Sequence, residues 1–170
     1  MKYIYLLRHA KSDWDTPFVT DHERGLATRG EKSVQFLRKF LETKEIQIDV
    51  AFVSDAKRTL QTYKLLNKNG SIIKNHVVVP ELYEAKLETY YNILKNTPDI
   101  EESILFVGHN PEIEEFANSL FGNQKQESIF YKFPTCACLC LSFDIESWSE
   151  IQNTIGKLVF YFTPSKGIKE

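Results

Sequence analysis

Short apolar runs recur along the chain, and they predict the strands of a sheet. Several runs are rich in β-branched or aromatic side chains, and turn residues bound most of them. The runs lie at residues 3–7, 50–53, 77–79, 104–107, 137–143 and 158–162. The pattern therefore predicts six short strands spread over the whole chain.

Amphipathic segments separate the first five runs and predict four helices. Each segment places its apolar residues on one stripe of a helix. The stripes are Val34, Leu37, Phe40 and Leu41; Leu60, Tyr63 and Leu66; Leu87, Tyr90, Tyr91 and Leu94; and Ile113, Phe116, Ala117, Leu120 and Phe121. The last helix also has Asn110 at the expected N-cap, Pro111 at the first helical position and Gly122 just past its end.

The alternation of strands and helices predicts an α/β fold. We expect three α/β/α layers, with a mostly parallel central sheet and helices on both faces. Only a polar segment separates the last two predicted strands, so we expect one antiparallel edge strand. A length of 170 residues fits a single domain, and we assign residues 1–170 to it. The polar segment 12–29 lies where a functional loop is expected.

Composition and charge exclude several classes of protein. The chain is 42% apolar and 26% charged, which is typical of a globular domain. Its 21 basic and 23 acidic residues give a net charge of −2, and no long basic run indicates a nucleic-acid partner. The longest uncharged stretch, residues 133–143, is far shorter than the ~20 residues that span a bilayer. The first apolar run is too short for a signal peptide, so we expect a cytoplasmic protein without a membrane partner.

The three cysteines, at positions 136, 138 and 140, alternate with other residues. This spacing differs from the paired spacing of a zinc site. On a strand all three thiols would point to one face, where we expect them to act as small buried apolar side chains. Three thiols cannot all pair within one chain, which favours a reducing compartment.

Polar side chains follow the predicted strands at the edge where α/β folds bind ligands. They are Arg8 and His9 after the first strand, Ser54, Asp55, Lys57 and Arg58 after the second, Glu84 after the third, and Gly108, His109 and Asn110 after the fourth. Because the carboxyl ends of parallel strands meet at one edge, we expect two arginines and two histidines to converge on one crevice.

These side chains favour phosphoryl chemistry. Two guanidiniums and a helix N-terminus form a site for a dianionic tetrahedral group such as phosphate. A neutral imidazole can attack phosphorus, and a second, protonated imidazole can stabilise the oxygens as charge builds. The set requires no metal and no cofactor. The chain has no Gly-rich loop before a Lys, so an ATP-binding site is not indicated.

Each of these residues also has an ordinary structural explanation. An arginine such as Arg8 is most often an exposed charge. His9 is compatible with a hydrogen-bonded core histidine, and His109 with a simple loop residue. Arg58 fits less well, because a cation in the first turn of a helix opposes the helix dipole. All four explanations would have to hold together, so we favour a shared site.

Four motifs, in order along the chain, resemble segments of the histidine phosphatase superfamily. They are residues 7–14 (LRHAKSDW), 21–30 (DHERGLATRG), 53–62 (VSDAKRTLQT) and 107–111 (VGHNP). The chain is most similar to the branch of SixA-like phosphohistidine phosphatases, and the resemblance implies a phosphoglycerate mutase-like domain. It also implies that His9 accepts the phosphoryl group, that Arg8 and Arg58 clamp the phosphate, and that His109 is the second imidazole.

Glu84 resembles the acid that protonates the leaving group in many relatives, although a solvated glutamate explains it equally well. Three positions depart from the usual pattern of the family. Ala10 replaces a common glycine, Gly25 replaces a proline, and Asp15 stands where mutase relatives have a phosphate-binding asparagine. A carboxylate repels phosphate, so we give Asp15 no phosphate-binding role.

We therefore predict a metal-independent hydrolase, a phosphatase that forms a covalent phosphohistidine on His9. The expected partner is a phosphorylated protein carrying phosphohistidine, or else a small phosphate ester. The alternatives are a small-molecule phosphomonoesterase of the same superfamily and a non-catalytic module that binds a phosphorylated ligand. A divalent-metal hydrolase using His9, His22 and His109 is disfavoured, because no His-x-x-x-His spacing is present. The sequence leaves the oligomeric state open.

Overall fold

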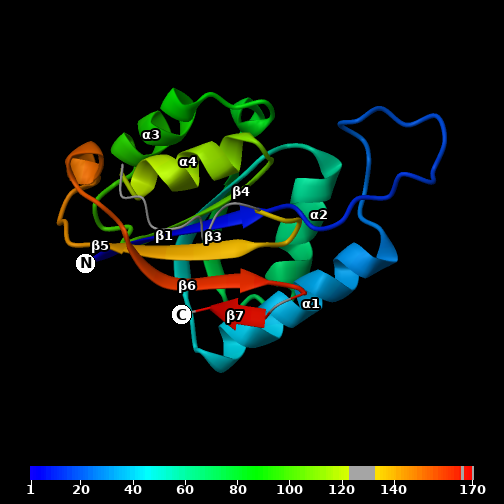
Figure 1. The fold of residues 1–170 in the computed structure, drawn as a ribbon, viewed down its shortest axis with the longest axis horizontal. Coiled ribbons are helices and arrows are strands. Elements are labelled where there is room, and N and C mark those ends of the chain that lie inside the picture. Colours follow the sequence, from blue (N-terminus) through cyan, green and yellow to red (C-terminus); the bar gives the residue numbers. More distant parts are fainter. Residues whose placement is uncertain (123–132, 166, 170) are drawn as a thin grey trace.

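The structure, a computed structural model, describes residues 1–122, 133–165 and 167–169. Within these residues seven strands form one sheet, in the order β3-β2-β4-β1-β5-β6-β7 (Figure 1). The strands are β1 (Lys2–Arg8), β2 (Ile48–Val53), β3 (Ile73–Val78), β4 (Ser103–Gly108), β5 (Cys138–Phe143), β6 (Lys157–Thr163) and β7 (Gly167–Lys169). The six predicted strands are all present, whereas β7 has too few residues to produce a recognisable pattern.

The sheet combines a parallel part with an antiparallel edge. β1 pairs in parallel with β4, β4 with β2, and β2 with β3. β5 runs antiparallel to β1, and β6 and β7 continue the antiparallel part to the edge. The predicted mostly parallel sheet is therefore confirmed, and its antiparallel edge contains β5, β6 and β7 where one antiparallel strand was expected. Each parallel connection needs a crossover segment, whereas antiparallel neighbours can be joined by short loops.

Helices cover both faces of the sheet, which gives the predicted three layers (Figure 1). α1 (Thr28–Thr43) and α2 (Lys57–Leu66) lie on one face, and α3 (Leu87–Lys95) and α4 (Glu112–Leu120) lie on the other. Two short 3-10 helices, η1 (Pro80–Leu82) and η2 (Trp148–Asn153), join the second layer. Among the described helices, none is both long and apolar enough to cross a membrane.

The start of α4 differs from the prediction. Pro111 occupies the N-cap position, so Glu112 is the first helical residue. Asn110 does not cap the helix, and its side-chain Nδ2 instead donates to the carbonyl of Phe133 at 2.9 Å. The prediction was one residue early because Asn followed by Pro is a frequent signal for a helix start. Gly122, with a φ of 65°, follows the helix end as expected.

Side chains of β1 alternate between two apolar layers, because successive residues of a strand point to opposite faces. Ile4 packs on the side of α3 and α4, and Tyr5 packs on the side of α1 and α2. Cys136, Cys138 and Cys140 all lie in the layer on the side of α1 and α2, and all three are buried and free, as predicted. Burial raises the pKa of Cys140 to about 12, so this thiol remains protonated.

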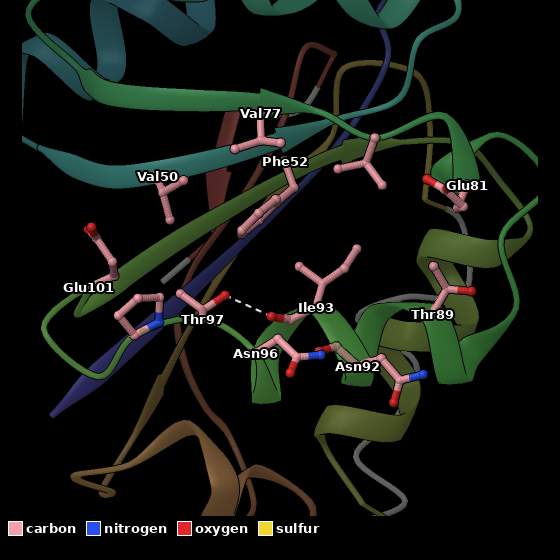
Figure 2. Close-up of a pocket in the computed structure, with 12 residues that line it drawn as sticks. Val50, Phe52, Val77, Glu81, Thr89, Asn92, Ile93, Asn96, Thr97 and Glu101 are labelled. Carbon is pink, nitrogen blue, oxygen red and sulfur yellow. Dashed lines mark hydrogen bonds between the residues drawn. The ribbon is translucent and has the colours of Figure 1, made fainter.

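A cavity of about 620 Å³ lies beside the edge strand β3 and against α3 (Figure 2). Its walls include the apolar side chains of Val50, Phe52, Val77 and Ile93. In the same wall the Thr97 hydroxyl donates to the carbonyl of Ile93 at 2.7 Å. Because none of the lining residues is a histidine or an arginine, the predicted chemistry does not belong to this cavity.

Candidate active site

The register between β1 and β4 brings two histidines together. Arg8, the last residue of β1, pairs with Gly108, the last residue of β4. The next residue on each strand is a histidine, and the amide of His9 donates to the carbonyl of Gly108 at 3.1 Å. The ring centroids of His9 and His109 are 5.4 Å apart. Parallel neighbours therefore present both imidazoles at one edge of the sheet.

The two predicted arginines reach the same edge from different elements. Arg8 continues β1, and its Nη1 donates to the carbonyl of Phe133 at 3.0 Å. Arg58 lies in the first turn of α2 and is only 8% exposed. Its Nη1 donates to the backbone carbonyl of Asp21 at 2.7 Å, and its Nη2 donates to the carboxylate at 3.1 Å. Burial lowers the pKa of His9, and the charges of both guanidiniums lower it further.

Asp21 and Tyr83 hold Arg58 in place, and sequence reasoning assigned neither a role. The Tyr83 hydroxyl donates to the same Asp21 oxygen at 2.5 Å. The Arg58 guanidinium lies 5.9 Å from the centre of the Tyr83 ring. The hydroxyl of Tyr83, and then the charge of Arg58, keep the pKa of Asp21 below its usual value. The available signal was the motif at 21–30, in which Asp21 stands at the first position.

A backbone contact determines which ring nitrogen of His9 carries the proton. Its Nδ1–H donates to the carbonyl of Ala10 at 2.7 Å, and a carbonyl can only accept. In the neutral ring Nε2 therefore has the free lone pair. The amide of Ala10 donates to Thr62 Oγ1 at 3.0 Å, and that hydroxyl donates to the carbonyl of Arg58 at 2.7 Å. Burial is the largest cause that lowers the pKa of His9 to about 4, so the ring is neutral at pH 7.

His109 is held differently and is also neutral. Its Nε2 forms a hydrogen bond of 2.8 Å with Ser54 Oγ, at the end of β2. Its buried Nδ1 has no hydrogen-bond partner among the described residues. Burial, followed by the neighbouring His9 and Arg58, lowers the pKa of His109 to about 3. Desolvation and nearby cations thus disfavour the charged form of this ring, for which the sequence analysis expected a protonated imidazole.

Glu84 lies on a turn after η1, beside the arginine–aspartate pair. Its side chain is exposed, and its φ of 59° is unusual for a residue other than glycine. It lines a cavity of about 220 Å³ at this edge of the sheet. The cavity is lined by Asp21, Arg58, Tyr83, Glu84, His109, Asn110 and Glu112. The structure therefore places Glu84 in the same cavity as Arg58 and His109.

Several other residues that the sequence analysis named lie at the margin of the site. Lys57 and Asp15 are exposed, and the amide of Asp15 donates to Asp13 Oδ1 at 2.8 Å within its loop. The side chain of His22 is partly exposed, and its Nε2 lies 2.8 Å from Asp55 Oδ1. Among the residues that the structure describes, no cluster of three or more His, Cys, Asp or Glu side chains could hold a metal ion.

Sequence comparisons find relatives over most of the chain. A protein of Arabidopsis thaliana, described as uncharacterised and chloroplastic, is 31% identical over 86% of this chain and 69% of its own length. An uncharacterised protein of Mycobacterium leprae is 30% identical over 93% of this chain and 99% of its own length. Neither relative has a stated activity, so these similarities show that the proteins are related but do not indicate a reaction.

Structural comparisons find the same fold in SixA proteins. A SixA from Agrobacterium tumefaciens, described as a candidate phosphohistidine phosphatase, is 26% identical, with a TM-score of 0.80 over 96% of this chain and 98% of its own. The protein histidine phosphatase SixA in complex with tungstate shares the fold, with 19% identity, a TM-score of 0.79 and coverage of 96% and 97%. The family model of the histidine phosphatase superfamily (branch 1) matches residues 4–97. With the site of two histidines and two arginines, these matches show that the chain belongs to the histidine phosphatase superfamily, in its SixA-like branch.

Proposed function

We propose that the protein hydrolyses a phosphorylated substrate through a covalent phosphohistidine on His9. The observation that carries this proposal is the environment of His9. Its ring is neutral, its Nε2 has the free lone pair, and it lies beside two guanidiniums and 5.4 Å from a second imidazole. A neutral ring nitrogen next to an anion-binding group is the arrangement that in-line attack on phosphorus requires.

In the first step Nε2 of His9 forms a bond to phosphorus, and the bond from phosphorus to the leaving atom breaks. The electron pair of that bond goes to the leaving atom, which takes up a proton. Arg8 and Arg58 donate hydrogen bonds to the oxygens of the transferring group. His109 can donate a third through Nδ1, which has no partner among the described residues. Removal of one such donor typically lowers kcat by about 10²–10³-fold.

In the second step a water molecule attacks the phosphorus held on His9. The bond from phosphorus to Nε2 breaks, its electron pair returns to the ring, and inorganic phosphate leaves. The water loses a proton in this step, and Glu84 is the exposed carboxylate of the same cavity that can accept it. Glu84 then passes this proton to solvent, which restores the carboxylate for the next cycle.

Protein phosphohistidine is the substrate class that the observations favour. The similar SixA of Agrobacterium tumefaciens is described as a candidate enzyme for this substrate. A protonated imidazole is a stable leaving group, so it needs less help from a proton donor than an alkoxide does. Glu84, whose side chain is exposed, suits the less demanding reaction. A small phosphate ester is the second candidate substrate, because the cavity of about 220 Å³ also fits a compact molecule.

The test measures hydrolysis of p-nitrophenyl phosphate and of a phosphohistidine peptide by the wild type and by His9→Ala. We expect His9→Ala to lose more than about 10³-fold in kcat on both substrates. Rapid quenching of the wild type should trap an acid-labile phosphoenzyme, and a chelator should leave the rate unchanged. Lys32→Ala, on the exposed face of α1, is the control and should keep full activity.

Survival of activity in His9→Ala, or its loss with the chelator, would refute the mechanism. Tight phosphate binding without turnover would indicate the non-catalytic module instead. Faster turnover of the small ester than of the peptide would favour a small-molecule phosphomonoesterase.

A further inference from the structure

The cavity next to the phosphate-binding groups has an acidic outer wall. Three of its lining residues are carboxylates, Asp21, Glu84 and Glu112, and Arg58 is the single arginine that lines it. The pKa of Asp21 is lowered, so this carboxylate is ionised at neutral pH. Because Arg58 is already paired with Asp21, the other two carboxylates leave the wall negatively charged.

This acidic wall lies beside residues that the proposed mechanism assigns to the phosphoryl group. Arg58 and His109 line the cavity, whereas the nucleophile His9 does not. In-line transfer to His9 places the leaving atom on the side of the phosphorus opposite Nε2. A substrate held by Arg58 and His109 would therefore extend from His9 into this cavity, towards its carboxylates.

Some polar atoms of this wall are hydrogen-bond acceptors that have no partner among the described residues. Glu112 Oε2 and Asn110 Oδ1 are buried atoms without a partner. Both side-chain hydrogen bonds of Asp21 go to Oδ2, and none of those found in the described part of the chain goes to Oδ1. His109, which is only 6% exposed, also lines the cavity, and its unpartnered Nδ1 is the atom that donates to the phosphoryl group in the proposed mechanism. Unfilled acceptors in a negative wall are suited to N–H donors with a positive charge.

We propose that this acidic cavity selects a phosphoryl group whose surroundings are cationic. The inference rests on the proposed phosphatase function and defines its substrate more closely. The ligand is phosphohistidine in a basic sequence context, with the protonated leaving imidazole and a neighbouring lysine or arginine facing the carboxylates. A phosphate with acidic neighbours meets Glu84 and Glu112 as like charges, so it binds more weakly.

The experiment compares two phosphohistidine peptides that differ only at the residues flanking the histidine, lysine in one and glutamate in the other. The measured quantity is the ratio of their kcat/KM values, which cancels any general change in activity. An exposed charge pair changes an equilibrium by up to about fivefold, so several together give a wild-type preference of about tenfold for the lysine peptide. This preference should decline as salt is raised, because salt screens exposed charges.

Glu112→Gln removes one charge of the wall and should lower the lysine preference by about threefold. Asp144→Asn is the matched control, because Asp144 is exposed and follows β5 at the opposite end of the sheet. The preference of this control variant for the lysine peptide should equal that of the wild type. The salt dependence of the wild type needs no variant and keeps the test decisive if Glu112→Gln fails to fold.

Equal kcat/KM values for the two peptides at low salt would overturn the inference while leaving the phosphatase function intact. A preference for the glutamate peptide would overturn it too. If neither peptide nor p-nitrophenyl phosphate is hydrolysed, the proposed function itself fails and the inference falls with it.

Discussion

At the scale of single residues, the carbonyl of Ala10 determines which nitrogen of His9 carries its proton. That carbonyl is fixed because the Ala10 amide donates to Thr62, a buried residue of α2. Ala10 is itself buried in the apolar layer on the side of α1 and α2, so its methyl group fits where the family pattern has a glycine. Ala10, whose amide is hydrogen-bonded and whose side chain is buried, therefore orients the imidazole before any substrate binds.

The depressed pKa values of the two imidazoles predict a stability that falls in acid. Folding buries both rings in neutral form, with pKa values of about 4 for His9 and about 3 for His109. An unfolded chain takes up these protons at about pH 6.5. The free energy of unfolding should therefore be fully developed above about pH 6.5 and fall as the pH drops towards 4.

Urea unfolding between pH 4 and pH 7.5 measures this dependence. His109→Asn removes one of the two groups and should flatten the slope of stability against pH. An unchanged slope in that variant would contradict the burial of a neutral ring. The histidine His76, which is exposed and stacks on Tyr63, provides the control variant His76→Asn, whose slope should match that of the wild type.

Strand ends identified Arg8, His9, Arg58 and His109 because topology alone brings such positions to one edge. Asp21 and Tyr83 were not identified from the sequence, because each lies on a loop or turn whose path cannot be predicted from a periodic pattern. The neutral state of His109 was not predicted either, since a pKa depends on burial and on neighbouring charges that only coordinates reveal.

At the scale of elements, Gly30 allows α1 to pack directly on the backbone that follows His9. A Cβ at this position would lie 2.3 Å from the Lys11 carbonyl oxygen and 2.9 Å from the Lys11 nitrogen. Both are backbone atoms, so neither can rotate away. The close approach fixes the chain just past β1 and His9.

Gly30→Ala should destabilise the protein by about 1–3 kcal/mol, the usual cost of overpacking. The higher helix propensity of alanine offsets this by at most about 1 kcal/mol, so the net effect on stability should be unfavourable. Thermal unfolding measures the loss of stability, and kcat should fall with it because the chain beside His9 must shift. Lys32→Ala, two residues further along α1, should change neither; a stable and fully active Gly30→Ala would exclude the tight packing.

Periodicity located the four long helices and six strands because each has an apolar stripe or run that must be buried. It did not detect β7 or η2, which are too short for a period to repeat. The start of α4 was misplaced by one residue, because the preference of Asn for N-caps yielded to the contact between Asn110 and Phe133.

At the scale of the whole molecule, the apolar layers and the reactive edge are separate parts of one sheet. Phe116 of α4 is fully buried, and it stacks on Tyr90 of α3 with ring centroids 4.5 Å apart. It belongs to the layer on the side of α3 and α4, whereas the guanidiniums and imidazoles stand beyond the strand ends. Stability and catalysis should therefore respond to different substitutions.

Phe116→Ala should lower the free energy of unfolding by about 3–5 kcal/mol, since it leaves a large cavity in the core. Urea titration measures this loss. At a temperature well below the transition, kcat on p-nitrophenyl phosphate should stay within about twofold of the wild type, because no group that binds the phosphoryl moves. A large loss of kcat in a protein that remains folded would show that core and edge are coupled.

The contacts of Arg58 with Asp21 and Tyr83 should lower the entropic cost of binding an oxyanion. A free arginine side chain loses up to about 2 kcal/mol of rotamer entropy when it is immobilised. Here Asp21 and Tyr83 have already immobilised it, so a ligand meets a receptor whose shape is set in advance. Association should therefore proceed with little reorganisation of the protein, and tungstate should leave the positions of Arg58 and Asp21 nearly unchanged.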